Sequence, residues 1–333
     1  MKIIVDCFGG DNCPDAAVKG AVLALEEDKE LNVALCGDED KIQAVLNTLS
    51  YDQSRISIID AKDVITNEDK PIDAIRNKEN SSMVVALNAV KSDEYAGVVS
   101  SGNTGALLTG STLIVGRIKG VSRATLAPAM PTLISGKYTI LCDAGANVDC
   151  KASMLKEFAI MGSIYAKKAF GIENPTIGLL NNGAEEEKGN ALTKEAYQVL
   201  KESNLNFVGN IEAQDYTSGK VDVIVADGFD GNVGLKATEG AAKAIMTLLK
   251  QGITNGGIKA KIGYLLLKPI LKHIKGFLST DTVGGAIFLG VKKVVVKAHG
   301  SSGEIPFKAT ILQAHRMAKG NLVSLIEDGV KNG

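Results

Sequence analysis

Aromatic side chains are scarce in this sequence of 333 residues, which has no tryptophan and only 5% aromatic residues. Its formal charge is −1 at pH 7, so neither base stacking nor a general positive field favours a nucleic-acid partner. Three histidines, and five cysteines without CxxC spacing, argue against a zinc site. The cysteines are odd in number and irregularly spaced, which is typical of reduced thiols in a cytoplasmic protein. We therefore expect no metal and no nucleic acid.

Long hydrophobic runs are also missing. No stretch of about 18 consecutive apolar residues occurs, so the sequence predicts no membrane-spanning helix. The N-terminal residues MKIIVDCFGG read as a short strand that breaks at Gly9 and Gly10, without the basic and apolar regions of a signal peptide. The remaining composition, with 45% hydrophobic and 23% charged residues, is that of a globular protein with a large core.

Strand-like runs recur along the chain, and each leads toward a plausible helix, such as residues 15–28 or 189–203. The runs cover residues 2–8, 31–37, 56–61, 95–101, 138–145, 176–183, 207–210, 221–228 and 292–300. This alternation predicts an α/β fold with a mostly parallel sheet and helices on both faces. No repeat or low-complexity linker interrupts it, so we expect a single catalytic unit over residues 1–333.

Several strands end in polar turns that contain glycine, and the sequence VVSSGNTGALLTG (98–110) is the clearest of them. Its bare backbone, its donor side chains and the helix that follows favour an anion. A Walker A motif is absent, and the first strand is not followed by the dinucleotide pattern GxGxxG. The anion is therefore expected to be free phosphate or the phosphate of a small molecule rather than ATP or NAD.

Seven segments together carry a resemblance to a known family. They are VDCFGGDNCP, SSGNTGALL, CDAGANVDC, IGLLNNGAEEEKGNALTKEAY, FVGNIE, ADGFDGNVGLKATEG and GVKKVVVKAHGSS. In this order they resemble the bacterial phosphate acyltransferases of phospholipid synthesis, which are acyl-[acyl-carrier-protein]:phosphate transacylases of the PlsX type. The resemblance implies an isopropylmalate-dehydrogenase-like three-layer α/β/α sandwich, normally a homodimer. It also implies that acyl carrier protein and inorganic phosphate are partners and that the acyl-phosphate product feeds a membrane glycerol-3-phosphate acyltransferase.

Such a reaction needs neither a cofactor nor a covalent enzyme intermediate, because phosphate can attack the thioester directly while the enzyme positions the reactants and stabilises charge. The resemblance implies that Lys188 is a catalytic cation, although an exposed lysine in an acidic stretch is the alternative. Asn232 could donate to the thioester oxygen, or simply cap a helix. His299 could bind phosphate or protonate the thiolate, or be a structural histidine.

Further residues are expected to bind phosphate or substrate, against the alternative that their turns are merely structural. They are Ser101, Gly102, Asn103, Thr104, Asp227, Lys297 and Ser301. One departure from the family pattern lies in DGFDGNVGLK, where Asp230 stands in place of the usual apolar residue. This departure puts the packing of that loop in question, while Asn232 is retained.

Residues 244–280 contain six lysines and many large apolar residues but no acid. Leu265 and Leu266 belong to a broad apolar arc, and Lys268 and Lys272 to a basic one, which predicts an amphipathic segment. Pro269 is expected to divide it into two helices and to begin the second. Such a segment suits peripheral binding to an anionic membrane, and packing in a core or dimer is the alternative.

Three other functions compete with the acyl carrier protein reaction. A phosphotransacetylase-like enzyme would use acyl-CoA as the thioester, and a membrane-associated scaffold would bind acyl carriers without catalysis. A metal- and NAD-dependent hydroxyacid dehydrogenase would need several arginines for its carboxylate substrate, whereas this chain has five, widely spread.

Overall fold

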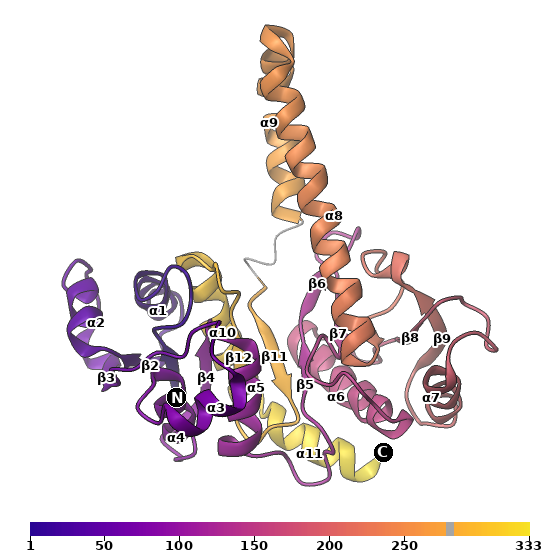
Figure 1. Cartoon of the computed structure of the whole chain (residues 1–333), viewed down its shortest axis with the longest axis horizontal. Helices are drawn as coiled ribbons and strands as arrows, with labels where there is room; N and C mark the ends of the chain where they lie inside the picture. Colours follow the sequence, from indigo (N-terminus) through magenta and orange to yellow (C-terminus); the bar gives the residue numbers. More distant parts are fainter. Residues whose placement is uncertain (278–282) are drawn as a thin grey trace.

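The computed structural model describes residues 1–277 and 283–333, and their strands form two sheets (Figure 1). The seven strands of the first sheet run in the order β3 (Ile56–Asp60), β2 (Asn32–Gly37), β1 (Lys2–Asp6), β4 (Tyr95–Ser100), β12 (Val294–Lys297), β11 (Ala286–Leu289) and β5 (Thr125–Ala127). The five strands of the second run in the order β6 (Ala129–Pro131), β7 (Tyr138–Cys142), β10 (Val223–Val225), β8 (Ile177–Asn181) and β9 (Phe207–Glu212).

Neighbouring strands are mostly parallel. In the first sheet β3 through β12 run parallel, and β11 runs antiparallel to both β12 and β5. In the second sheet only the edge strand β6 is antiparallel to its neighbour. The carboxyl ends of the parallel strands therefore share one edge of each sheet, where ligands bind in open α/β folds.

Helices cover both faces of the sheets, because successive strand residues point to opposite sides. Ile3 and Val5 belong to a core with α1 (Asp15–Glu27), α6 (Ala152–Phe170), α10 (Glu304–Lys319) and α11 (Leu322–Asn332), whereas Ile4 belongs to a second core with α4 (Ser82–Ala89) and α5 (Thr104–Gly110). The remaining helices are α2 (Glu39–Leu46), α3 (Pro71–Asn77), α7 (Ala191–Lys201), the short turns η1 (Gln53–Arg55) and η3 (Ala213–Asp215), and the π-helical turn η2 (Ser111–Val115). The predicted α/β/α class is confirmed.

All nine predicted strands are present, with ends that differ by a few residues. The sequence did not indicate β5, β6 and β11, which are three or four residues long. Each antiparallel pair described above includes at least one of these strands. Strands this short show no alternation that a pattern can reveal. Their absence from the prediction also hid the division into two sheets, because β5 and β6 are the adjacent segments that lie in different sheets.

The amphipathic segment forms part of a helical hairpin that projects from the body of the molecule (Figure 1). Its helices are α8 (Gly228–Asn255) and α9 (Gly257–Phe277), and the predicted segment 244–280 extends at its end into residues outside those described. None of the helices within the described residues is long and apolar enough to span a bilayer.

The expected break at Pro269 is wrong, because Pro269 lies inside the continuous helix α9. The chain instead reverses at Gly256 and Gly257, and Gly257 has φ +69°, a conformation that glycine adopts without penalty. Pro269 removes one helical hydrogen bond, but it lies on an exposed helix where water can bind the carbonyl left free.

Candidate active site

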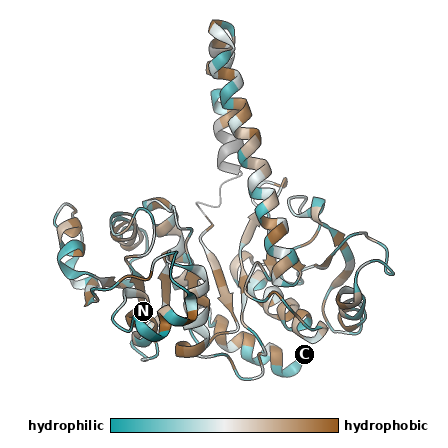
Figure 2. Cartoon of the chain, in the orientation of Figure 1, coloured by the Kyte–Doolittle hydropathy of each residue, from teal (hydrophilic) through white to brown (hydrophobic). Residues whose placement is uncertain are grey.

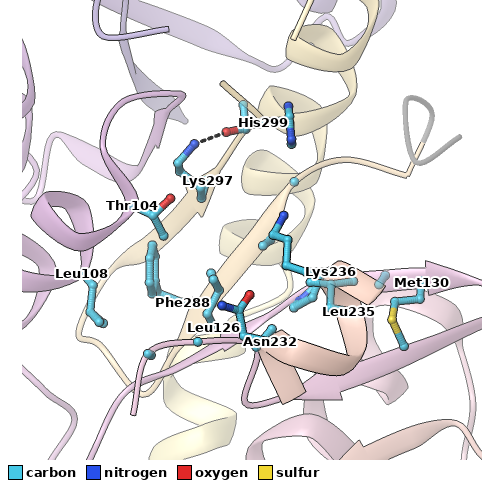
Figure 3. Close-up of a pocket in the computed structure, with 18 of the residues that line it drawn as sticks. Thr104, Leu108, Leu126, Met130, Asn232, Leu235, Lys236, Phe288, Lys297 and His299 are labelled. Atoms are coloured by element: carbon cyan, nitrogen blue, oxygen red, sulfur yellow. Dashed lines mark hydrogen bonds between the residues drawn. The ribbon is translucent and has the colours of Figure 1, made fainter. Parts of the chain in front are cut away.

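A cavity of about 440 Å³ lies between the two sheets, at the end of the molecule from which the hairpin projects. Four residues predicted from the sequence line it, namely Thr104, Asn232, Lys297 and His299 (Figure 3). Lys297 is the last residue of β12 in the first sheet and His299 follows it by two residues, whereas Asn232 lies on α8, which follows β10 of the second sheet. The cavity thus combines groups from both sheets.

Lys297 is the most buried cation of this cavity. Its Nζ donates to the carbonyl oxygens of Ser101, at 3.0 Å, and Ala298. Since an ammonium group carries three protons, one N–H remains for a ligand. Burial lowers the pKa of Lys297 to about 8, although the nearby carboxylate of Asp6 acts in the opposite direction.

Asp6 links the ends of β1 and β4 beneath the cavity. Its carboxylate accepts hydrogen bonds from Ser100 Oγ at 2.6 Å and from the Phe8 N–H at 3.2 Å, and Ser100 Oγ in turn accepts from the Gly102 N–H at 3.1 Å. Burial raises the pKa of Asp6 to about 6. Asp6 is therefore a buried negative charge that fixes the predicted phosphate loop.

The residues of the loop 101–104 differ in whether their side chains reach the cavity. Asn103 caps α5 by accepting from the Ala106 N–H at 3.0 Å, and its Nδ2 donates to the Thr66 carbonyl at 3.2 Å. Ser101 is buried, with its Oγ 3.4 Å from the Sγ of Cys13. Only Thr104 of this loop lines the cavity with its side chain, so any contribution of Asn103 to an anion is through its backbone.

His299 is exposed at the edge of the cavity, and Ser301 orients its ring. The Ser301 N–H donates to Nδ1 at 3.3 Å, and Ser301 Oγ lies 2.9 Å from the same nitrogen. Asn12 anchors this turn by donating from Nδ2 to the Ser301 carbonyl at 3.0 Å. Because Nδ1 accepts a hydrogen bond, the proton of the neutral ring resides on Nε2.

Asn232 is placed by the first turns of α8. Asp227 caps this helix by accepting from the Asp230 N–H at 2.7 Å, and burial raises the pKa of Asp227. Gly231 packs so closely that a Cβ there would lie 2.0 Å from the Asp143 carbonyl oxygen. Asp230 itself is exposed in the first helical turn, where an acid complements the helix dipole, so it does not disturb the packing.

Asp143 holds the turn that faces α8. Its carboxylate accepts from the Leu126 N–H at 2.9 Å and the Asn147 N–H at 2.7 Å, and also from Asn147 Nδ2 at 2.9 Å. These hydrogen bonds make Asn147 part of the scaffold of this turn. Within the described residues, no group of three or more His, Cys, Asp or Glu side chains is arranged to hold a metal.

Lys188 is not brought into this cavity. It lies exposed in the loop after β8, where its N–H donates to the Glu185 carbonyl at 3.2 Å and its carbonyl accepts from Asn181 Nδ2 at 3.1 Å. The cavity instead contains two charged residues that sequence reasoning missed, Lys236 and Glu239. The available signal was spacing, because Lys236 follows Asn232 by four residues on the same helix and so shares its face.

Comparison with known proteins assigns the chain to a family. Residues 1–325 match the family model described as a fatty acid synthesis protein. The chain is 48% identical to a phosphate acyltransferase of Clostridium acetobutylicum and 49% identical to one of Clostridium botulinum, with 98% of each chain covered in both cases. The chain belongs to the phosphate acyltransferase family.

Solved structures confirm the fold of this phosphate acyltransferase. A phosphotransacetylase from Streptococcus pyogenes aligns with a TM-score of 0.60 at 19% identity, covering 96% of this chain and 94% of the other. A branched-chain phosphotransacylase from Enterococcus faecalis aligns with a TM-score of 0.57 at 16% identity, covering 96% and 99%. At these identities the likeness is one of architecture.

Apolar residues form the other wall of the phosphate acyltransferase cavity. They are Leu108, Leu126, Pro128, Ala129, Met130, Leu235 and Phe288, together with small neighbours. This wall lies opposite the polar strand ends, as the close-up shows for the labelled members (Figure 3). The cavity therefore offers charge to one part of a ligand and hydrophobic surface to another.

Proposed function

We propose that this phosphate acyltransferase transfers the acyl group of acyl-[acyl-carrier-protein] to inorganic phosphate. A phosphate oxygen attacks the thioester carbonyl, the carbon–sulfur bond breaks, and the carrier leaves as a thiolate that takes up a proton. The single observation that carries the proposal is a cavity with a cation, an amide and an apolar wall together. The cation suits the phosphate, the amide suits the thioester carbonyl, and the apolar wall suits the acyl chain.

Lys297 and His299 bind the attacking phosphate. The free N–H of Lys297 faces a cavity in which Nε2 of His299 and the hydroxyl of Thr104 offer further donors. Ser101 and Gly102 act through the backbone, since the Ser101 carbonyl holds the lysine. Ser301 orients the histidine, which is also the proposed proton donor to the departing thiolate.

Asn232 stabilises the oxyanion of the tetrahedral intermediate. In the part of the chain that the structure describes, its side chain has no hydrogen-bond partner, and it lies against Gly145, where no side chain blocks a thioester. Asp227 supports it by capping α8. Lys188 lies outside this cavity, in the loop that follows β8 beside β10, so its role as a catalytic cation stays a prediction that the Lys188→Ala variant tests.

The hairpin of α8 and α9 attaches the enzyme peripherally to an anionic membrane. Leu265 and Leu266 are 66% and 76% exposed, and Lys268 is exposed nearby, which supports insertion of the apolar face with lysines at the headgroups. The side chain of Lys272 lies outside those described. Hydrophobic residues lie along the projecting hairpin between hydrophilic ones (Figure 2), and they also suit a homodimer that leaves part of the hairpin free. The acyl phosphate passes to a membrane glycerol-3-phosphate acyltransferase.

The test is phosphate-dependent release of free thiol from long-chain acyl-[acyl-carrier-protein], with Lys188→Ala and Asn232→Ala beside the wild type. Loss of the Asn232 amide should lower kcat about 100- to 1,000-fold, as for other oxyanion donors. The exposed neighbour Val233→Ala is the matched control. Thiol release without phosphate would indicate a thioesterase, and preference for acyl-CoA would favour a phosphotransacetylase-like reaction. No release at all would favour the scaffold.

A further inference from the structure

Lys236 is a charged residue of the cavity to which the reaction described above gives no role. It lies one helical turn after Asn232 on α8, and its side chain extends towards the side of the cavity that bears Lys297 and His299 (Figure 3). Its positive charge contributes to lowering the pKa of Lys297. The ammonium groups of Lys236 and Lys297 thus face the same cavity, and they repel one another when the cavity holds no anion.

The present partner of Lys236 is Glu239, one turn further along the same helix. The Nζ of Lys236 lies 2.7 Å from a carboxylate oxygen of Glu239, but the two side chains are 59% and 48% exposed. An ion pair this exposed contributes little free energy, so an anion in the cavity can replace the carboxylate at small cost. A doubly charged anion between Lys236 and Lys297 would also remove the repulsion between them.

We propose that Lys236, on α8, binds the attacking inorganic phosphate together with Lys297, at the end of β12. The carboxylate of Glu239 is the ion-pair partner of Lys236 until phosphate binds. The inference rests on the proposed function. The ligand is a small oxyanion, because two ammonium groups that line the same cavity match an ion whose several oxygens can each accept a hydrogen bond. A phosphodiester on the carrier's prosthetic arm has the same chemistry, and the kinetic test separates the two.

The experiment measures the initial rate of thiol release over a range of phosphate concentrations and, separately, of acyl carrier concentrations. Lys236→Met should raise the KM for phosphate about tenfold or more, which is the loss of one charge-assisted hydrogen bond, and leave the KM for the thioester unchanged. Lys236→Arg should restore most of the affinity. Glu239→Gln should lower the KM for phosphate, because the competing carboxylate is gone.

Lys243→Met is the matched control, since Lys243 is exposed on the same helix and does not line the cavity. An unchanged KM for phosphate in Lys236→Met overturns the inference, and so does a raised KM for the thioester instead, which would assign Lys236 to the carrier's phosphodiester. Opposite shifts in the Lys236 and Glu239 variants support it, because a merely structural pair would change both in the same direction. Absence of phosphate-dependent release in the wild type would instead refute the proposed function.

Discussion

The charge on Lys297 should impose an alkaline limit on the reaction. Its pKa is lowered to about 8, chiefly by burial. At this pKa about 90% of the enzyme carries the charge at pH 7 and about 9% at pH 9. Activity should fall as the pH rises, because only protonated Lys297 binds phosphate and this form is lost as the pH passes about 8. The value of kcat/KM for phosphate should therefore fall about tenfold per pH unit above that point.

The assay is thiol release at low phosphate and saturating acyl carrier between pH 6 and 10, with two variants. Asp6→Asn removes a negative charge that supports the protonated lysine, so the alkaline limit should move to lower pH. Lys297→Arg keeps a charge that does not titrate in this range, so the limit should disappear in the enzyme that remains folded. The charges of Asp11 and Lys236 also affect the pKa of Lys297, and so does the Cys13 thiol once it ionises. An unchanged limit in both variants would refute the reasoning.

Two further predictions concern packing and the hairpin. Gly231→Ala should destabilise the fold by about 1–3 kcal/mol in urea unfolding, because its Cβ would meet the Asp143 carbonyl at 2.0 Å. Gly240→Ala on the same helix meets nothing within 4 Å and should be neutral or stabilising, so equal losses in both would contradict the explanation. The double variant Lys268→Glu and Lys272→Glu should bind anionic liposomes more weakly than the wild type. Lys220→Glu, on the body of the molecule, is the control. Unchanged binding of the double variant would exclude the hairpin as the lipid contact.

The sequence predicted the parallel part of the fold because those strands are buried apolar runs that end in glycine-containing turns. It predicted neither the antiparallel strands nor the reversal at Gly256 and Gly257, since a pair of glycines on an exposed helix is a weaker signal than Pro269. Local pattern favoured the proline, but an exposed helix tolerates one missing hydrogen bond.

The candidate site was predictable where residues lie at or just after the end of a strand, as Lys297 and His299 do at the end of β12. It was not predictable where placement depends on the contact between sheets. The apolar wall joins the site because β5 and β6, separated by Pro128 alone, lie in different sheets, whereas Lys236 could have been found from its spacing to Asn232. Asn103 is the opposite case. It lies in the predicted loop, but its side chain already caps α5 and is therefore not free to bind a ligand.

The close seating of α8 at its first turns has a mechanical consequence. A helix of 28 residues is about 42 Å long, and Asn232 lies about 6 Å from its beginning. If the helix tilts about the contact between Gly231 and Asp143, a 4 Å displacement of the far end moves Asn232 by well under 1 Å. The projecting hairpin can therefore be pushed or held by whatever it binds while the reacting groups keep their alignment.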